Sequence, residues 1–261
     1  MFPFNKIALI GSGNVSFAFS KALRNNGINP NYIFVRNKNK RKEVEEIFGV
    51  EAITNYDYIL DCDLVIIAVN DDAIKDVALN LNNYKGLLVH TSGTQSSSLL
   101  SNVENYGILY PLQTLTKGFD VDLKKVPLLI NASSSDCLSR LKMFATSISD
   151  IVVECSDEER AQIHMSAVYV SNFVNVMLQI GDKLLNDRGL DISILESLVR
   201  ETVNKSFLLG PEQALTGPAK RGDIDTINKH LSLLDNNIEE KKIYELLTNY
   251  ILNKYSHNEK L

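Results

Sequence analysis

An alternation of short apolar runs with amphipathic stretches constrains the fold of the first 154 residues more than any other feature. The apolar run Lys6–Ile10 is followed by a glycine-rich turn and by the amphipathic stretch Val15–Asn26, which ends at Gly27. The same pattern continues in the segments Tyr32–Val35, Lys40–Phe48, Leu64–Val69, Leu87–His90, Gly107–Leu109 and Pro127–Ile130. Strands that alternate with helices are joined by right-handed crossovers and form a mostly parallel sheet. We therefore expect a doubly wound α/β domain over residues 1–154.

Helical patterns replace the strand pattern after about residue 155. Ser156 and Glu159 have the spacing of a capping box, which predicts the start of a helix that extends to about Asn186. Aspartates suited to cap further helices stand at Asp191 and Asp223. The sequence therefore predicts an all-helical second domain over residues 155–261.

The composition excludes several classes of protein. The 261 residues are 44% hydrophobic and 23% charged, with a formal net charge of −5, which is typical of a globular enzyme and argues against a nucleic-acid partner. No apolar run approaches the roughly 20 residues of a membrane span, and Ile7–Ile10 is too short for a signal peptide. The cysteines form no C-x-x-C pair, so neither a disulfide framework nor a metal site is expected. We expect a cytoplasmic protein with no membrane partner, whose polar tail Ser256–Leu261 frays.

The turn after the first predicted strand has the pattern of a dinucleotide-binding site. Its first glycine permits the tight turn, and the second lets the backbone approach a pyrophosphate at the start of the following helix. Ser16 stands where glycine or alanine is usual, but its side chain is small enough to pack near the strand. The alternative interpretation is a plain glycine-rich turn. The cofactor-binding residues expected here are Gly11, Ser12, Gly13, Asn14 and Val15.

The residues after the second predicted strand indicate which dinucleotide binds. NAD sites place an acidic residue there to bind the ribose 2′-OH, but no carboxylate precedes Glu43. Five of the seven residues 36–42 are basic instead, and arginine suits a 2′-phosphate. The alternative is a solvated basic helix start, in which the cations oppose the helix dipole. We expect NADP, with Arg36 and Asn37 among its binding residues.

Two further strand ends are expected to face the cofactor, because ligands of doubly wound sheets bind beyond the carboxyl ends of the strands. Val69 and Asn70 close one strand, although a helix cap at Asp71 or Asp72 is an equally good explanation of the polar residues there. Thr91 begins a loop of small residues with room for a nicotinamide ring, and an ordinary turn is the alternative.

The chain resembles a group of bacterial Rossmann-like proteins described as candidate NADP oxidoreductases, whose helical C-terminal domain has no assigned function. The resemblance rests on five motifs: GSGNVS, DLVIIAVNDDAI, HTSGT, YPLQT and LTGPAKRGD. The amino-terminal part is similar to pyrroline-5-carboxylate reductases, 3-hydroxyisobutyrate and 6-phosphogluconate dehydrogenases and deazaflavin-dependent NADP reductases. The resemblance implies NADP on the first glycine-rich turn, Arg36 near the adenosine phosphate, and a homodimer formed through the helical domain. Two departures stand out: Tyr110 replaces an expected histidine, and the long helix lacks the Lys-x-x-x-Asn pair of hydroxyacid dehydrogenases.

Polar residues on the long predicted helix are the candidates for catalysis. At about 100° per residue, Asn175 lies within roughly 20° of His164 on the helix surface, and Asn172 lies about 80° away. An imidazole is a natural acid or base for proton transfer, and the two asparagines would orient the substrate. A purely structural set of polar residues is the alternative. Arg221 is expected to bind an anionic group, or to pair with Asp223 and only brace its loop.

The sequence thus predicts an NADP-dependent oxidoreductase that transfers hydride between the nicotinamide and a small polar, anionic substrate in the cleft between its domains. The alternative from another class is a sensor or regulatory module that binds NADP without turnover, which the missing Lys-x-x-x-Asn pair favours. A dimer with a vestigial site, in which Ser16 or Phe17 fills the pyrophosphate pocket, is the third possibility.

Overall fold

The computed structural model describes residues 3–119 and 121–255, so the predicted tail 256–261 lies outside the described residues. The chain forms two compact units, Met1–Asn172 and Phe173–Leu261. The boundary expected after residue 154 coincides with the end of the last strand, and the helix that follows it belongs to the first unit.

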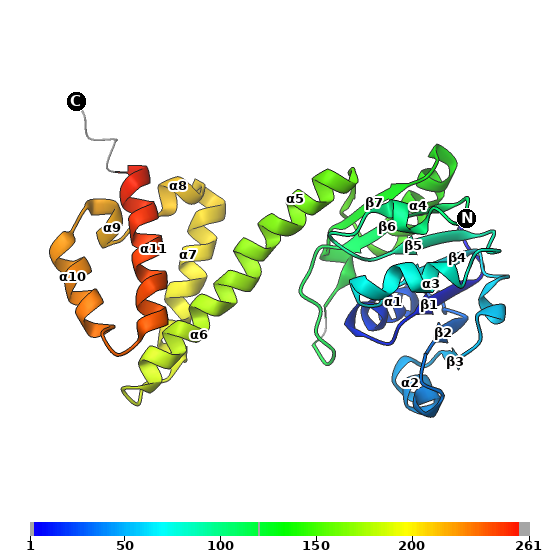
Figure 1. Ribbon diagram of the computed structural model, residues 1–261, viewed down its shortest axis with the longest axis horizontal. Coiled ribbons are helices and arrows are strands. Elements are labelled where there is room, and N and C mark those ends of the chain that lie inside the picture. The colour runs from blue at the N-terminus through cyan, green and yellow to red at the C-terminus, as the bar shows by residue number, and fades with distance from the viewer. Residues whose placement is uncertain (1–2, 120, 256–261) are drawn as a thin grey trace. The chain divides into compact units, whose positions relative to one another are not determined.

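An eight-stranded sheet forms the centre of the first unit (Figure 1). Its strands are β1 (Ile7–Ile10), β2 (Tyr32–Phe34), β3 (Glu51–Ile53), β4 (Leu64–Ile67), β5 (Leu87–His90), β6 (Tyr106–Pro111), β7 (Leu128–Ala132) and β8 (Val152–Glu154). Their order is β3-β2-β1-β4-β5-β6-β7-β8, and every neighbouring pair is parallel except β6 and β7. The expected doubly wound, mostly parallel Rossmann sheet is confirmed, while the short strands β3 and β8 were not predicted.

Helices pack on both faces of this sheet. They are α1 (Asn14–Asn25), α2 (Arg41–Phe48), α3 (Ile74–Leu79) and α4 (Ser135–Ile148). The helix α5 (Asp157–Ala167) follows the last strand and contributes no residue to either core. Alternate residues of a strand enter different cores: Leu9 joins the cluster under α1, α2 and α4, whereas Ala8 and Ile10 join the cluster under α3. Both faces are therefore buried, which explains why the central strands are continuously apolar.

The capping box predicted at the start of α5 is present. The backbone N–H of Glu159 donates to Ser156 Oγ at 3.1 Å, and the N–H of Ser156 donates to a Glu159 carboxylate oxygen at 2.7 Å. The helix does not continue uniformly, however, because residues Val168–Asn172 form the π-helical turn η6. The helical stretch ends at Asn186 as predicted, but the π turn divides it into two α-helices.

The second unit is helical throughout its described part. Its helices are α6 (Phe173–Asn186), α7 (Glu196–Leu209), α8 (Pro211–Ala214), α9 (Pro218–Arg221), α10 (Ile224–Leu233) and α11 (Ile238–Tyr255). Asp191 caps the 3-10 turn that leads into α7, and Asp223 caps α10 by accepting from the N–H of Thr226 at 3.1 Å. None of the described helices combines the length and the apolar composition that crossing a membrane requires.

Candidate active site

The turn from β1 into α1 leaves backbone N–H groups available to an anion. Gly11 has φ +112°, and a Cβ built on it would lie 2.3 Å from the carbonyl oxygen of Ala68, so only glycine fits between the ends of β1 and β4. A Cβ on Gly13 would meet nothing within 4 Å. Gly13 supplies no side-chain cap, and the first turn of α1 contains no acidic residue. The helix start therefore offers unshared donors and the positive end of its dipole.

Two cavities lie on either side of this turn, beyond the carboxyl ends of the strands. The first, of about 620 Å³, is lined by Ile10, Gly11, Ser12, Gly13, Phe34, Val35, Arg36, Thr54, Tyr56, Ala68, Val69, Asn70, Ala73 and Val77. The second, of about 550 Å³, is lined by Gly13, Asn14, Val15, Ala68, Val69, Asn70, Asp71, Thr91, Ser92, Gly93, Thr94, Gln113, Leu115 and His164. Gly13 and the end of β4 contribute to both. The pair thus has the extended form that a dinucleotide needs at the switch point of such a sheet.

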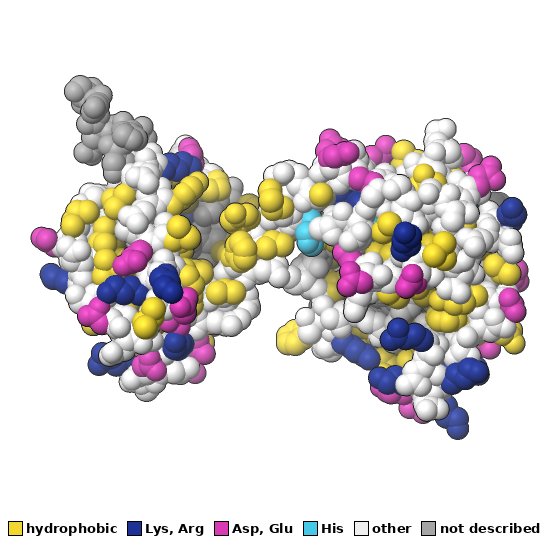
Figure 2. Space-filling view, viewed as in Figure 1, with side chains coloured by type: hydrophobic (Ala, Val, Ile, Leu, Met, Phe, Trp, Pro, Cys, Tyr) yellow, Lys and Arg dark blue, Asp and Glu magenta, His cyan; other side chains and the backbone are white. Residues whose placement is uncertain are grey.

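A basic surface adjoins the first cavity. Arg36 lines that cavity, and its exposed side chain has no ion pair with any described residue. Arg41 is already engaged, because its Nε donates to the Ala52 carbonyl at 2.7 Å. Asn37 accepts from the N–H of Asn39 at 3.0 Å and so caps a 3-10 turn instead of lining the cavity. Figure 2 shows Lys and Arg side chains gathered over the region of α2. Of the predicted pair, Arg36 lines the first cavity and Asn37 does not.

Asn14 and Asp71 both line the second cavity and make hydrogen bonds to the loops around it. The side chain of Asn14 donates to the Leu115 carbonyl at 2.8 Å and accepts from the N–H of Lys117 at 3.2 Å, so it anchors the loop after β6. Asp71 accepts from Ser92 Oγ at 2.9 Å and from Thr94 Oγ1 at 3.1 Å. The alternative cap by Asp71 is therefore not formed, and this carboxylate fixes the small-residue loop.

His90 is a structural residue. It is fully buried, its Nδ1 accepts from the N–H of Ser92 at 3.2 Å, and its Nε2 lies 3.2 Å from the Ser96 carbonyl. Burial lowers the pKa of His90 to about 4, so the ring is neutral at physiological pH. Thr91, next to it, lines the second cavity, and its hydroxyl donates to the Ile67 carbonyl at 3.3 Å.

Tyr110 and His164 form a polar pair beside the second cavity. The Tyr110 hydroxyl lies 2.9 Å from His164 Nδ1, and either atom donates depending on the histidine tautomer. The ring of His164 also packs against the loop after β5, because a Cβ on Gly93 would lie 2.5 Å from its Nδ1. Sequence reasoning gave Tyr110 no role. Its place at the carboxyl end of β6, the same edge as the other cavity loops, is the signal that identifies it.

Of the remaining catalytic candidates, Asn172 lies at the end of the first unit, and Asn175 and Arg221 belong to the second unit. A π turn has i→i+5 hydrogen bonds, so the rotation of 100° per residue that aligned Asn175 with His164 does not hold across η6. Asn172 is exposed at the end of that turn, and Asn175 accepts from Gln179 at 2.6 Å within α6. Arg221 is exposed at the end of α9 and makes no salt bridge with Asp223 within the described part of the chain. Asn172, the candidate that shares a unit with the second cavity, does not line it.

The family is shown by comparison with a solved structure. A protein of Bacteroides fragilis described as a candidate NADP oxidoreductase has a TM-score of 0.87 and 30% identity, over 97% of this chain and 100% of that chain. This chain belongs to the same family of NADP oxidoreductases. It is an NAD(P)-dependent oxidoreductase whose cofactor is NADP, and the resemblance drawn from the five motifs is confirmed.

Two family models match parts of the chain, and two more distant structures share its fold. Residues 6–90 match a family described as "NADP oxidoreductase coenzyme F420-dependent", and residues 126–251 match a domain of unknown function, DUF2520. A pyrroline-5-carboxylate reductase of Coxiella burnetii has a TM-score of 0.59 and 18% identity, over 99% of this chain and 100% of that chain. An imine reductase of Myxococcus stipitatus in complex with NADP⁺ has a TM-score of 0.63 and 14% identity, over 97% of this chain and 93% of that chain. These two share the fold. No curated protein matches the chain significantly.

Proposed function

We propose that this oxidoreductase transfers hydride between NADP and a small polar, anionic substrate that binds in the second cavity. The observation that carries the proposal is the Tyr110–His164 pair, which provides a proton donor and acceptor beside a cavity continuous with the glycine-rich turn. The Coxiella and Myxococcus proteins named above are reductases of a cyclic imine acid and of imines, which supports a substrate with a reducible C=N or C=O group.

The residues present fit NADP. The open space beyond Gly13 and the uncapped start of α1 suit a pyrophosphate, and the unpaired Arg36 at the far end of the first cavity suits a 2′-phosphate. When bound, NADP supplies or accepts the hydride. Ser16 and Phe17, which a vestigial site would place in the pyrophosphate pocket, line neither cavity.

Proton transfer is assigned to His164, with Tyr110 as its hydrogen-bond partner. Burial raises the pKa of Tyr110, so the phenol stays protonated at neutral pH and holds the histidine in place. The imidazole then gives a proton to the substrate in the reductive direction or takes one in the oxidative direction. The roles expected of Asn172 and Asn175 in orienting the substrate, and of Arg221 in binding its anionic group, stay predictions from the sequence.

Lys220 braces the loop that carries Arg221. Its ammonium group donates to the Leu215 carbonyl at 2.8 Å and to the Glu212 carbonyl at 3.2 Å. The bracing role considered for Arg221 is therefore filled by its neighbour, which leaves the guanidinium of Arg221 available to a ligand.

A binding titration followed by a turnover screen tests the proposal. The chain contains no Trp, so nicotinamide fluorescence can be followed against a low background. We expect NADPH to bind at micromolar concentration and at least tenfold more tightly than NADH. Keto acids, cyclic imines and hydroxy acids are then screened for NADPH oxidation or NADP⁺ reduction. Binding without turnover of any of these would favour the sensor, which the missing Lys-x-x-x-Asn pair already favours.

A matched pair elsewhere in the chain provides the control for His164. His230 Nδ1 lies 2.8 Å from the Tyr244 hydroxyl, with the rings at 79°, and this pair belongs to the second unit. His164→Gln is expected to lower kcat by about 10²–10⁴, whereas His230→Gln should leave kcat within about twofold. If kcat falls by less than about threefold in His164→Gln, His164 does not carry out the proton transfer.

We also propose that the helical domain forms a homodimer. Large apolar side chains are exposed on its helices, among them Phe207 at 89%, Leu208 at 81% and Leu246 at 70% of their surface. Exposed apolar faces of this kind are typical of association sites. Sedimentation at micromolar concentration should give twice the mass of the chain, and Phe207→Lys should give a monomer. The cytoplasmic location stays a prediction from the sequence.

A further inference from the structure

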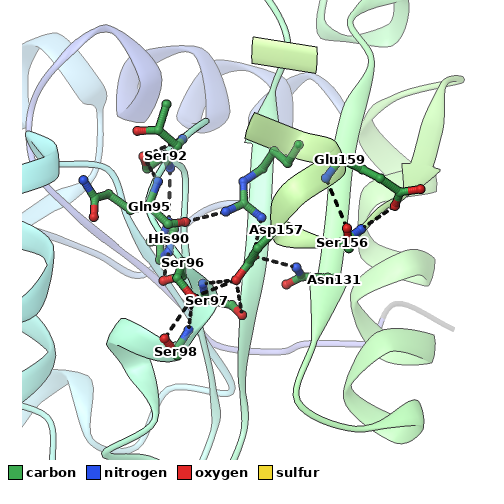
Figure 3. A network of polar contacts seen from close by, with 12 residues as sticks. His90, Ser92, Gln95, Ser96, Ser97, Ser98, Asn131, Ser156, Asp157 and Glu159 are labelled. Carbon is green, nitrogen blue, oxygen red and sulfur yellow. Dashed lines mark hydrogen bonds and ion pairs between the residues drawn. The ribbon is translucent and has the colours of Figure 1, made fainter. Parts of the chain in front are cut away.

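An ion pair in the first turn of α5 fastens that helix to two other segments of the first unit. Figure 3 shows the Asp157 carboxylate among Ser96, Ser97 and Asn131. It accepts from Ser96 Oγ at 2.8 Å, from the N–H of Ser97 at 2.9 Å, and from Asn131 Nδ2 at 3.0 Å. Asp157 thus ties the start of α5 to the loop after β5 and to β7.

Arg160 completes the attachment from one turn further along the helix. Its side chain is fully buried, and its Nη1 donates to Asp157 at 2.7 Å. Its Nη2 donates to the carbonyl oxygen of Gln95 in the loop after β5. Burial alone would raise the pKa of Asp157, but the hydrogen bonds from Arg160, Ser96, Ser97 and Asn131 outweigh it and hold this pKa well below its ordinary value. The Asp157 carboxyl is therefore ionised at neutral pH.

This attachment lies next to the proposed proton-transfer group. His164 follows Arg160 by four residues, so the two side chains project from the same face of α5, one turn apart. The His164 ring packs against Gly93, and Arg160 bonds to the Gln95 carbonyl two residues further along the same loop. The two parts of this loop are linked to each other, because Ser92 Oγ accepts from the N–H of Gln95 at 3.1 Å.

We infer that Asp157 and Arg160 are positioning residues, which fix His164 against the loop that lines the second cavity. Neither touches that cavity, so their effect on turnover is transmitted through His164 and the loop. Catalytic geometry must hold to a fraction of an ångström, and a buried, charge-assisted attachment is a stiffer support than helix packing alone. The inference rests on the function proposed for His164.

Glu159 offers a matched control on the same helical turn. Its side chain is exposed and accepts from the N–H of Ser156, but it makes no contact with the loop after β5 within the described residues. Glu159→Gln therefore perturbs the start of α5 without loosening its attachment to the cavity loop. Asp157→Asn removes the charge at nearly constant volume, and Arg160→Lys keeps the charge while removing the two-pronged donor.

The test measures NADPH affinity, turnover and the His164 ring signals in the ¹H–¹³C NMR spectrum, assigned with His164→Gln. In Asp157→Asn and Arg160→Lys we expect the NADPH Kd within twofold of wild type, kcat at least tenfold lower, and displaced His164 signals. Glu159→Gln should leave all three at wild-type values. Combined with His164→Gln, neither positioning variant should lower kcat further.

Several outcomes would overturn the inference. Wild-type kcat and wild-type His164 signals in both variants would show that the attachment positions nothing. A rise in NADPH Kd in proportion to the fall in kcat would show a general loss of structure. If the wild-type protein turns over no substrate, the proposed function fails, but the NMR comparison of the two variants with Glu159→Gln still decides whether this ion pair sets the place of His164.

Discussion

Replacing each of the two glycines of the β1–α1 turn by alanine separates folding from cofactor binding. In Gly11→Ala the new Cβ would lie 2.3 Å from the Ala68 carbonyl oxygen, on a residue with φ +112°. The unusual φ costs about 1–3 kcal/mol, and relieving the overlap costs about 1–3 kcal/mol more. We therefore expect the free energy of unfolding to fall by about 2–6 kcal/mol, and Tm by at least about 4 °C.

Gly13→Ala is the contrasting change. Gly13 has φ −84°, which alanine adopts without strain, and a Cβ there meets no protein atom within 4 Å. The loss of stability should be about 0.5–1 kcal/mol, because alanine is a poorer N-cap than glycine. The added methyl group would occupy the space assigned to the pyrophosphate, so the Kd for NADPH should rise at least tenfold.

Thermal unfolding and nicotinamide fluorescence, measured on both variants, decide the matter. The expected pattern is a destabilised Gly11→Ala and a folded Gly13→Ala that no longer binds NADPH tightly. Unchanged NADPH affinity in Gly13→Ala would refute the assignment of this helix start to the pyrophosphate. An unchanged Tm in Gly11→Ala would show that the contact with Ala68 does not restrict this position.

Three further predictions follow from the same structure. Arg36→Gln should weaken NADPH binding by about 10- to 100-fold and leave NADH binding unchanged, because it removes only the charged contact to the 2′-phosphate; fluorescence titration of both nucleotides checks this. Tyr110→Phe should lower kcat at least tenfold in steady-state assays, with Tyr244→Phe as the control without effect, because it frees the His164 ring. The depressed pKa of His90, about 4 against 6.5 when unfolded, contributes about 3 kcal/mol of stability that is fully present above pH 6.5 and lost as the pH falls to 4. Denaturant unfolding at several pH values should show that the free energy of unfolding of the wild type falls between pH 6.5 and pH 4. In His90→Asn, this His90-dependent part of the fall should be absent.

The fold was predictable where the pattern is local and repeated. The runs that became β1 and β4 are continuously apolar because both faces of each strand are buried. The strand β8 is three residues long and mostly exposed, so it carries no such pattern. The sequence pattern also did not indicate that β6 and β7 pair in antiparallel fashion, because strand direction depends on the path of the chain between them.

The cofactor side of the site was more predictable than the catalytic side. Gly11, Gly13 and Arg36 are identified by their positions next to strand ends. The Tyr110–His164 pair joins residues 54 positions apart, and that contact exists only after the sheet has formed. The π turn η6 could not be predicted from the sequence for another reason. It differs from an α-helix in its hydrogen-bond register and not in its composition.

The common wall of the two cavities is narrow, and this has a consequence for how the family can diversify. Only Gly13, Ala68, Val69 and Asn70 contribute to both. Arg36 and His164 lie on separate segments and line different cavities, so substitutions at these two positions should combine additively. A descendant could exchange its preferred nucleotide without losing its chemistry, or acquire a new reaction while keeping the same source of reducing equivalents.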